Sequence, residues 1–320
     1  MIPITLLECT LYSDYPIDLG ANPGSSLRGA LYETLAAMYD TGDSAKSRHD
    51  SETNPVAWLL RLEDEVKTGG KDAPRPIAIR PPRPEPGLLS AMSGSQSGAT
   101  TAFVIALYGR ARDVAGLIVS AVASTGGIGM GRGRERGAGR YTLRRVRALD
   151  PLTGQGTEIV DMQGRQIAEL PSPPSAEAYA HFAALLQADR LSVQFITPTR
   201  IIDHQALCKQ PAFRPWFQRL LERIRQISDL YAEPVWIPFA ELLGAADVIQ
   251  TADDQTYWQE LWSHSRIDGM YKPVSGFVGK VEYTGEFDLL LPYLLVGQSL
   301  QVGKNAIKGG GWYEMTYRWR

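Results

Sequence analysis

The sequence predicts an α+β protein of two tandem ferredoxin-like domains, each with the element order βαββαβ. Its 320 residues exceed one typical hydrophobic core and fit two domains. An apolar helix, a glycine-dense turn and a closing strand also occur in that order twice. Residues 170–175 hold three prolines and two serines, as a linker does. We therefore expect an N-terminal domain with inserted loops over residues 1–170, a linker and short helix over 171–190, and a C-terminal domain over 191–320.

The first half contains the elements of one such domain in order. Alternating apolar residues predict a strand over 4–12, and Leu27, Leu31, Leu35 and Met38 recur at helical spacing behind a turn with a capping serine. The other predicted elements are a short strand at 77–79, a strand at 101–108, a buried helix at 114–123, a closing strand at 141–147 and a hairpin over 154–166.

The second half repeats this order. Six apolar residues between Phe213 and Tyr231 form a helical stripe. The other predicted elements are strands at 191–202, 257–266, 276–283 and 312–319 and a helix at 287–296. In this arrangement both helices cover one face of an antiparallel sheet, and the other face is free. Such an RRM-like platform binds RNA in several unrelated modules, although a fold alone does not fix a function.

The composition, with 44% hydrophobic and 21% charged residues, is that of a folded globular protein. No apolar run approaches the roughly 20 residues needed to span a bilayer, and the first residues lack the basic flank of a signal peptide. We therefore expect a soluble, cytoplasmic protein without a membrane partner. Cys9 and Cys208 lie far apart, without a CxxC motif or a nearby histidine pair, so no disulfide framework, metal site or cofactor is expected.

Positive charge is concentrated in one segment. The net charge of −2 gives no global indication of nucleic-acid binding, because dedicated binders are often basic overall. Residues 132–147 nevertheless contain seven arginines and one acid, whereas residues 233–260 contain six acids and no Lys or Arg. Strand alternation places Thr142, Arg144 and Val146 on one side and Leu143, Arg145 and Arg147 on the other, so only part of the run can face one partner. The alternative for such a run is a solvated ribbon.

Two glycine-dense segments, 126–134 and 303–311, carry basic residues. Both can be plain helix-to-strand turns, since such turns need glycine for positive φ. Their length, basic content and repetition point instead to a phosphate-bearing polymer. Neither fits a Walker loop, because Asn305 follows Lys304, and neither fits a dinucleotide loop, because each follows a helix and precedes a strand. Backbone amides of such loops can approach phosphates closely.

Six segments resemble, in their order along the chain, the CRISPR-associated endoribonucleases that process precursor CRISPR RNA. The segments are residues 22–30, 73–82, 127–133, 195–200, 279–285 and 302–314. These enzymes belong to the repeat-associated mysterious protein (RAMP) superfamily, and the resemblance implies tandem ferredoxin-like domains with a C-terminal glycine-rich loop. It also implies metal-independent cleavage of CRISPR repeat RNA by the ribose 2′-hydroxyl, which leaves a 5′-hydroxyl and a 2′,3′-cyclic phosphate.

The resemblance implies that basic residues and the glycines of the C-terminal loop contact RNA. The candidate set is Arg28, Arg132, Arg134, Arg136, Arg140, Arg144, Gly303, Lys304, Lys308, Gly309 and Gly311. Arg28 combines a cation with the start of a helix, which suits a phosphate. The alternative for Arg28 is a local ion pair with Glu33 or Asp40.

The implied cleavage needs a base for the 2′-hydroxyl proton, an acid for the leaving oxygen, and cations or amides around the phosphorane. Relatives often carry a catalytic histidine after the first helix, where this chain has His49, with Tyr39 and Lys46 close in sequence. A histidine can serve as base or acid near neutral pH. The alternatives are that His49 is an exposed loop residue and that His204 or His264 is the base.

One segment departs from the family pattern. Many similar sequences have cysteines between the first helix and Trp58, whereas this chain has none there, so a metal-stapled loop is not expected. A function from another class also fits: a non-catalytic RNA-binding RAMP subunit of a CRISPR effector complex would share the fold without the active site. An unrelated two-domain small-molecule enzyme is a third alternative, for which no cofactor motif is present. The sequence leaves the oligomeric state open.

Overall fold

The computed structural model describes residues 2–39, 59, 67–68, 71–83, 98–187, 189–264 and 270–319. The chain divides into two compact units. The N-terminal unit comprises Thr5–Leu149 and Gln155–Ser172, and the C-terminal unit comprises Met1–Ile4, Asp150–Gly154 and Pro173–Arg320. No helix in the described part of the chain is long and apolar enough to cross a membrane.

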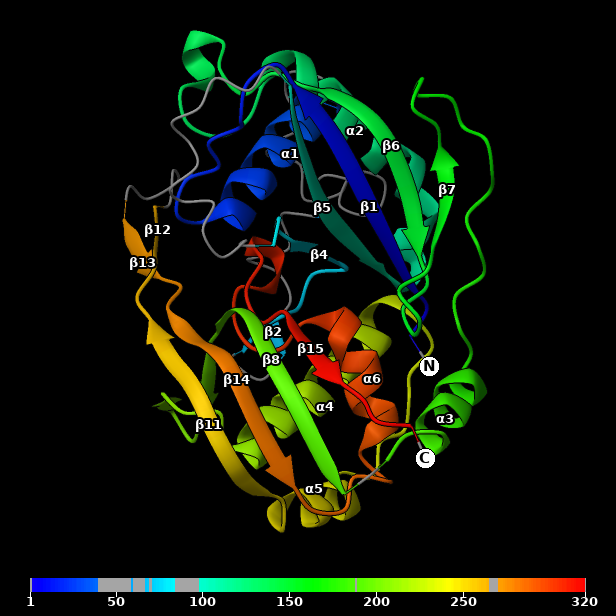
Figure 1. The fold of residues 1–320 in the computed structure, drawn as a ribbon, viewed down its shortest axis with the longest axis vertical. Helices are drawn as coiled ribbons and strands as arrows, with labels where there is room; N and C mark the ends of the chain where they lie inside the picture. Colours follow the sequence, from blue (N-terminus) through cyan, green and yellow to red (C-terminus); the bar gives the residue numbers. More distant parts are fainter. Residues whose placement is uncertain are drawn as a thin grey trace. The chain divides into compact units, whose positions relative to one another are not determined.

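The N-terminal unit is an antiparallel sheet covered by two helices. The strands are β1 (Ile4–Ser13), β4 (Ile77–Arg80), β5 (Ala99–Tyr108), β6 (Thr142–Leu149) and β7 (Gly156–Val160). Their order in the sheet is β4-β5-β1-β6-β7, and α1 (Pro23–Tyr39) and α2 (Ala115–Ile128) lie behind the same sheet face (Figure 1). Shorter elements are β2 (Lys67–Thr68), β3 (Lys71–Asp72), and the 3-10 helices η4 (Gly109–Val114) and η5 (Arg134–Arg136). The first four of the sheet strands have the ferredoxin-like order.

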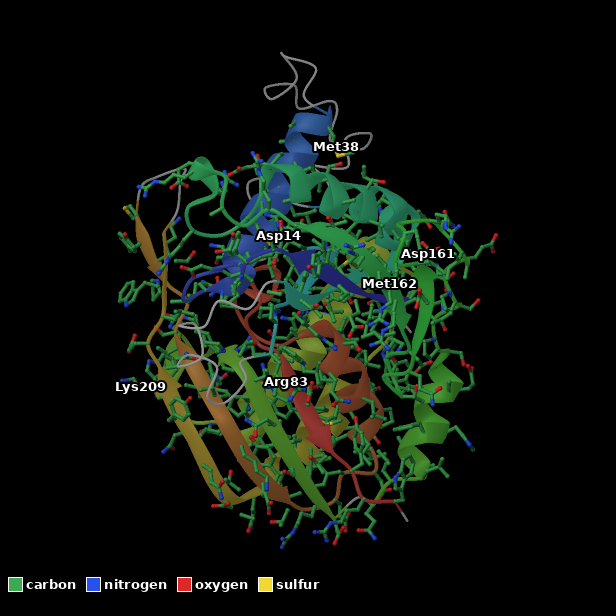
Figure 2. All side chains as sticks on the ribbon, turned by 45° about the horizontal axis from the view of Figure 1, so that its top comes forward. Asp14, Met38, Arg83, Asp161, Met162 and Lys209 are labelled. Carbon is green, nitrogen blue, oxygen red and sulfur yellow. The ribbon has the colours of Figure 1, made fainter. Side chains whose placement is uncertain are left out.

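Helix α1 begins earlier than the sequence predicts. Its N-cap is Asn22, whose side-chain oxygen accepts the N–H of Ser25 at 3.3 Å, and its first residue is Pro23. A serine is therefore not the cap. Arg28 is the sixth residue of α1 and lies in its second turn rather than at the start of the helix. Met38, near the outer end of α1 in Figure 2, is 45% exposed rather than buried.

The pairing of β1 with β6 contains a β-bulge. Leu11 pairs with Leu143 and Thr10 pairs with Arg145, so Arg144 is an extra residue on β6. A bulge interrupts the alternation of side chains along a strand. The residues before and after it therefore do not follow one period of two.

Because of this bulge, the predicted distribution of the arginines over the two sides of β6 is wrong. The sequence places Thr142, Arg144 and Val146 on one side, whereas Val146 is buried together with Leu143. Arg144 packs instead over the aromatic ring of Tyr12, with its guanidinium carbon 5.0 Å from the ring centroid. The positive charge of Arg144 therefore lies beside an aromatic side chain that is 36% exposed.

The C-terminal unit has the same topology. Its sheet order is β11-β14-β8-β15, built from β8 (Arg190–Thr199), β11 (Gln250–Gln259), β14 (Gly276–Thr284) and β15 (Tyr313–Thr316). The two helices that follow β8 and β14, α4 (Phe213–Tyr231) and α6 (Leu291–Leu300), lie behind this sheet in Figure 1. The additional elements are α3 (Ala176–Ala184), α5 (Phe239–Asp247), β9 (Ile201–Asp203), β10 (Ala206–Cys208), β12 (Trp262–His264), β13 (Tyr271–Pro273) and η6 (Ala306–Lys308).

Aromatic side chains hold the core of this unit. The ring of Trp216 on α4 meets Phe195 of β8 at 5.5 Å and Tyr313 of β15 at 4.9 Å, both edge to face. Its face stacks on Tyr283 of β14. One helix side chain thus joins three neighbouring strands, which explains why the apolar stripe of α4 is predicted so clearly from the sequence.

Two predicted elements of the C-terminal unit are displaced along the sequence. Strand β11 begins at Gln250, seven residues before the predicted start, because its side chains are almost all exposed and show no apolar alternation. Helix α6 begins at Leu291 rather than residue 287, because the N–H of Leu290 bonds to the carbonyl of Phe287 in a preceding turn. The order βαββαβ in both units nevertheless confirms the predicted fold class.

Candidate nucleic-acid interface

The C-terminal glycine loop joins α6 to β15 and is closed on itself. The N–H of Val302 donates to the carbonyl of Gly311 at 2.9 Å. Two further bonds fix the loop to the end of β8: the N–H of Lys304 donates to the carbonyl of Arg200 and that of Gly311 to the carbonyl of Pro198, both at 3.1 Å. The position of the loop is therefore set by a strand about one hundred residues earlier.

Glycine is required where the loop touches the backbone. Gly311 has φ +75°, and a Cβ there would lie 2.0 Å from the carbonyl oxygen of Val302. Gly303 has φ +94°, and its Cβ would lie 2.5 Å from the carbonyl oxygen of Arg200. Both positions combine a left-handed backbone with a contact too close for a side chain. These glycines therefore determine the shape of the loop.

The N-terminal glycine loop, between α2 and β6, makes the equivalents of two of these contacts. The N–H of Met130 donates to the carbonyl of Gly139 at 3.0 Å, and the N–H of Arg132 donates to the carbonyl of Asp18 at 2.7 Å. A Cβ on Gly139 would lie 1.9 Å from the carbonyl oxygen of Met130, and one on Gly131 would lie 2.2 Å from that of Asp18. Asp18 follows β1 as Arg200 follows β8.

The two loops correspond residue by residue. Residue numbers differ by 172 at every equivalent position, as for Met130 and Val302 at the entrance and Gly139 and Gly311 at the exit. Each loop contains one 3-10 turn, η5 or η6, between two residues in the left-handed region. The flanking residues are Gly133 and Gly137 in the N-terminal loop, and Asn305 and Gly309 in the C-terminal loop. The sequence indicates the repetition but not this register, because glycine positions differ between the loops.

Two cationic positions are also shared. Arg132 and Lys304 follow the equivalent glycines 131 and 303, and Arg136 and Lys308 end the equivalent 3-10 turns. The side chains of Arg132 and Arg136 are 72% and 88% exposed. Lys304 is exposed and Lys308 is half-buried. Each loop therefore presents a basic residue at the same two points of one backbone.

The remaining arginines of the run differ from one another. Arg134 forms an ion pair with Glu33 on α1, and its side chain is only 24% exposed. Arg147 donates a 2.7 Å hydrogen bond to Glu8 across the β1–β6 pair. Arg140 is exposed near the end of the loop. The predicted arginine surface thus combines partly buried arginines that pair with a carboxylate, Arg134 and Arg147, with exposed ones such as Arg140. The sequence alone does not distinguish these two groups.

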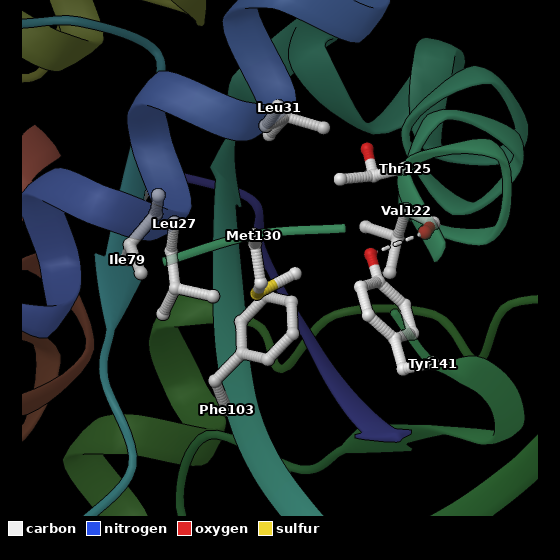
Figure 3. A pocket seen from close by; sticks show the side chains of 8 residues that line it. All are labelled: Leu27, Leu31, Ile79, Phe103, Val122, Thr125, Met130 and Tyr141. Carbon is white, nitrogen blue, oxygen red and sulfur yellow. Dashed lines mark hydrogen bonds between the residues drawn. The ribbon is translucent and has the colours of Figure 1, made fainter. Parts of the chain in front are cut away.

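A small pocket lies under the N-terminal loop (Figure 3). It is lined by Leu27, Leu31, Ile79, Phe103, Val122, Thr125, Met130 and Tyr141. The lining is apolar except for two hydroxyls, and these already donate to backbone carbonyls: Thr125 to Ala121 at 2.7 Å and Tyr141 to Val122 at 2.6 Å. Among these eight lining residues, both hydroxyl groups therefore already use their protons in hydrogen bonds within the protein. The pocket therefore belongs to the apolar support of the loop, and the outer surface of the loop remains the candidate interface.

The predicted catalytic group lies largely outside the described residues. His49 and Lys46 fall in the range 40–58, and Tyr39 is described only as the last backbone position of α1. His204 is exposed in the turn between β9 and β10, with its Nδ1 atom 3.1 Å from Asp203. His264 pairs with Tyr271 across the β12–β13 ladder. Among the described residues, no group of three or more His, Cys, Asp and Glu side chains could hold a metal ion.

Comparison with known protein families gives a match for each half of the chain. A family model described as the CRISPR-associated endoribonuclease Cas6 matches residues 193–313, and the model of an N-terminal domain family, AF_1859_N, matches residues 2–172. Residues 193–313 therefore belong to the Cas6 family of CRISPR-associated endoribonucleases. The C-terminal glycine loop lies within the Cas6 match, and the N-terminal glycine loop lies within the other. A search of curated protein sequences finds no significant match.

Solved structures of Cas6 proteins share the fold along the whole chain. A Cas6 product complex is 14% identical with a TM-score of 0.58, covering 98% of this chain and 100% of that chain. A partial Cas6-RT-Cas1–Cas2 complex is 13% identical with a TM-score of 0.57, covering 99% of this chain and 46% of that chain. A Thermus thermophilus Cas6 is 14% identical with a TM-score of 0.52 and 99% coverage of both chains. At these identities the likeness shows the double ferredoxin-like fold.

Proposed function

We propose that this Cas6-family protein binds CRISPR repeat RNA and cuts it by attack of a ribose 2′-hydroxyl, without a metal ion, leaving a 5′-hydroxyl and a 2′,3′-cyclic phosphate. The observation that carries the proposal is the C-terminal loop, which presents Lys304 and Lys308 from a backbone fixed to the end of β8. This loop lies inside the segment that matches the Cas6 endoribonuclease model. The similar Cas6 product complex supports the same class of substrate.

The RNA contacts follow from the positions of the cations. Phosphate contacts fix an RNA backbone without reading its sequence, and charged side chains strengthen them. We assign this role to the C-terminal loop, with Gly303, Gly309 and Gly311 setting the backbone that carries the lysines. The arginine contacts that complete the proposed RNA surface are Arg28, Arg132, Arg134, Arg136, Arg140 and Arg144.

The cleavage step needs proton transfer at two oxygens. We propose that His49 accepts the proton of the attacking 2′-hydroxyl or protonates the leaving 5′-oxygen, because an imidazole exchanges protons near neutral pH. Tyr39 and Lys46 are proposed to supply the second proton transfer and a positive charge beside the phosphorane. No step in this scheme requires a metal ion.

The test uses purified protein, labelled cognate repeat RNA and an excess of EDTA. We expect one defined cut in EDTA, with a product that carries a cyclic phosphate. His49→Ala is expected to abolish the cut and keep RNA binding, whereas His181→Ala, an exposed histidine on α3, is the matched control and is expected to cut normally. Full activity of the His49 variant would remove His49 from the mechanism. Dependence of the wild-type cut on a divalent ion would contradict the metal-independent scheme.

A second candidate is an RNA-binding subunit without catalytic activity. The observation that favours a role within a complex is the match of this chain to 46% of a chain from a partial Cas6-RT-Cas1–Cas2 complex. We accordingly propose association with a CRISPR protein complex as a further role. The same experiment separates the two candidates: retention of repeat RNA without any cut by wild-type protein supports the subunit and contradicts the enzyme.

A further inference from the structure

We propose that the N-terminal glycine loop, residues 129–140, is a second RNA-backbone site, in which Arg132 and Arg136 take the places of Lys304 and Lys308. The inference rests on the proposed function of the C-terminal loop, residues 301–312. It assigns two of the seven arginines between 132 and 147 a definite role and separates them from the rest of the run.

The first argument is the equivalence of the backbones. The loops share five main-chain hydrogen bonds at positions that differ by 172, including the closing bonds from Met130 to Gly139 and from Val302 to Gly311. Arg132 and Lys304, which follow the equivalent glycines 131 and 303, each donate their N–H to a carbonyl that follows the first strand of their unit. Side chains at equivalent positions of equivalent backbones leave the main chain in equivalent directions. Two loops of this kind can present their cations to a phosphate in the same way.

The second argument is the choice of residues. The C-terminal 3-10 turn begins with buried Ala306, and the equivalent N-terminal residue, Arg134, is tied to Glu33 of α1. The shared cations therefore stand two residues before each turn and at its last residue. A solvated ribbon gives no reason for basic residues to recur at the same two positions. Phosphate binding by both loops would explain why basic residues occur at these same two positions.

The third argument concerns the carboxylates near these arginines. Arg132 is 3.8 Å from Asp18 and Arg136 is 3.9 Å from Glu135, in both cases between exposed side chains. Such exposed pairs are weak and are screened by salt. An RNA phosphate, which accepts two parallel hydrogen bonds from one guanidinium, competes well with them. The two arginines can therefore exchange their present neighbours for RNA without loss of the loop fold.

The test compares two double variants of the full-length protein in binding to uncleaved repeat RNA over a range of salt concentrations. Arg132→Ala with Arg136→Ala and Lys304→Ala with Lys308→Ala are each expected to weaken binding by about tenfold at low salt. Each is also expected to make the plot of log affinity against log salt less steep by about 0.7–0.9 for every phosphate that the variant no longer neutralises. A matched control removes two other exposed, paired arginines, Arg165→Ala with Arg190→Ala, and is expected to change the slope little.

A variant that keeps the positive charge distinguishes an effect of charge on RNA binding from an effect of substitution on folding. Arg132→Lys with Arg136→Lys gives the N-terminal loop the cations of the C-terminal loop and is expected to bind RNA with nearly wild-type salt dependence. If the N-terminal alanine variant keeps wild-type affinity and slope while the C-terminal variant binds weakly with a shallower slope, the second site is contradicted and the proposed function stands. If wild-type protein does not bind repeat RNA, the proposed function itself fails. An equal weakening in the arginine control would also overturn the assignment, because the effect would then be general charge.

Discussion

Tyr141 donates a hydrogen bond of 2.6 Å to the backbone carbonyl of Val122, nineteen residues earlier in the chain. Tyr313 donates an equivalent bond of 2.7 Å to Leu294, again over nineteen residues. In each unit the bond runs from the start of the closing strand to the helix before the glycine loop. Both hydroxyls are buried, and burial raises the pKa of Tyr141 above its ordinary value. In each unit a buried hydrogen bond thus links the helix before the glycine loop to the strand after it.

Removing either hydroxyl is expected to destabilise its unit. Tyr141→Phe and Tyr313→Phe each remove a buried hydrogen bond to a helix carbonyl, which costs about 0.5–1.5 kcal/mol of the free energy of unfolding. Urea unfolding followed by tryptophan fluorescence and circular dichroism measures the change. Tyr257→Phe, at a tyrosine that is 64% exposed, is the control and is expected to change little. Equal free energies of unfolding for all three variants would show that these tyrosine hydrogen bonds do not stabilise the protein.

The glycines at the loop exits are expected to be far less tolerant than glycines elsewhere. Gly139→Ala places a side chain 1.9 Å from the carbonyl oxygen of Met130 in a left-handed backbone, which alone costs about 1–2 kcal/mol. The variant is expected to melt at a lower temperature and to bind RNA more weakly. Gly116→Ala in α2, where a Cβ meets nothing within 4 Å, is expected to be neutral or stabilising by about 0.5–1 kcal/mol. Similar melting temperatures for both variants would contradict the close contact.

The ion pair between Glu33 and Arg134 is expected to restrain RNA binding. Glu33→Gln removes the carboxylate and leaves the cation of Arg134 without that partner, beside the proposed phosphate site. RNA affinity should then rise by a few fold at low salt, with a steeper salt dependence, because one more cation can release a counterion. Filter binding at several salt concentrations measures both quantities. A weaker affinity in this variant, at unchanged stability, would mean that the pair instead positions the loop for RNA.

The two thiols are expected to differ in reactivity. Cys9 is fully buried, and burial raises the pKa of its thiol to about 12, whereas Cys208 is half-buried in β10. Since the thiolate is the reactive form, native protein near pH 8 should react with a thiol reagent at Cys208 and not at Cys9. The folded state holds the Cys9 proton more tightly than the unfolded chain, so its contribution to stability is present at low pH and is lost as the pH rises from about 9 toward 12. Rapid labelling of Cys9 in native protein would contradict its burial.

Much of the fold follows from local patterns in the sequence. The stripe between Phe213 and Tyr231 predicts α4 with correct ends, because one face of a helix is buried against three strands. The start of strand β11 is predicted wrongly, since exposure of nearly all its side chains removes the apolar alternation that marks a strand. The sides of the β6 arginines are predicted wrongly because a bulge depends on pairing with β1, which no residue of β6 specifies alone.

The sequence by itself determined that two halves repeat one order of helix, glycine loop and strand, because periodicity and glycine content are local properties of the chain. Only the tertiary structure decided that the loops are equivalent residue by residue. Their register depends on the carbonyls of Asp18 and Arg200, which strands distant in sequence bring to each loop. The same holds for Arg134, whose partner Glu33 lies 101 residues away. Interactions between distant segments, rather than the charge of any one segment, therefore distinguish the cations that face solvent from those that hold the fold.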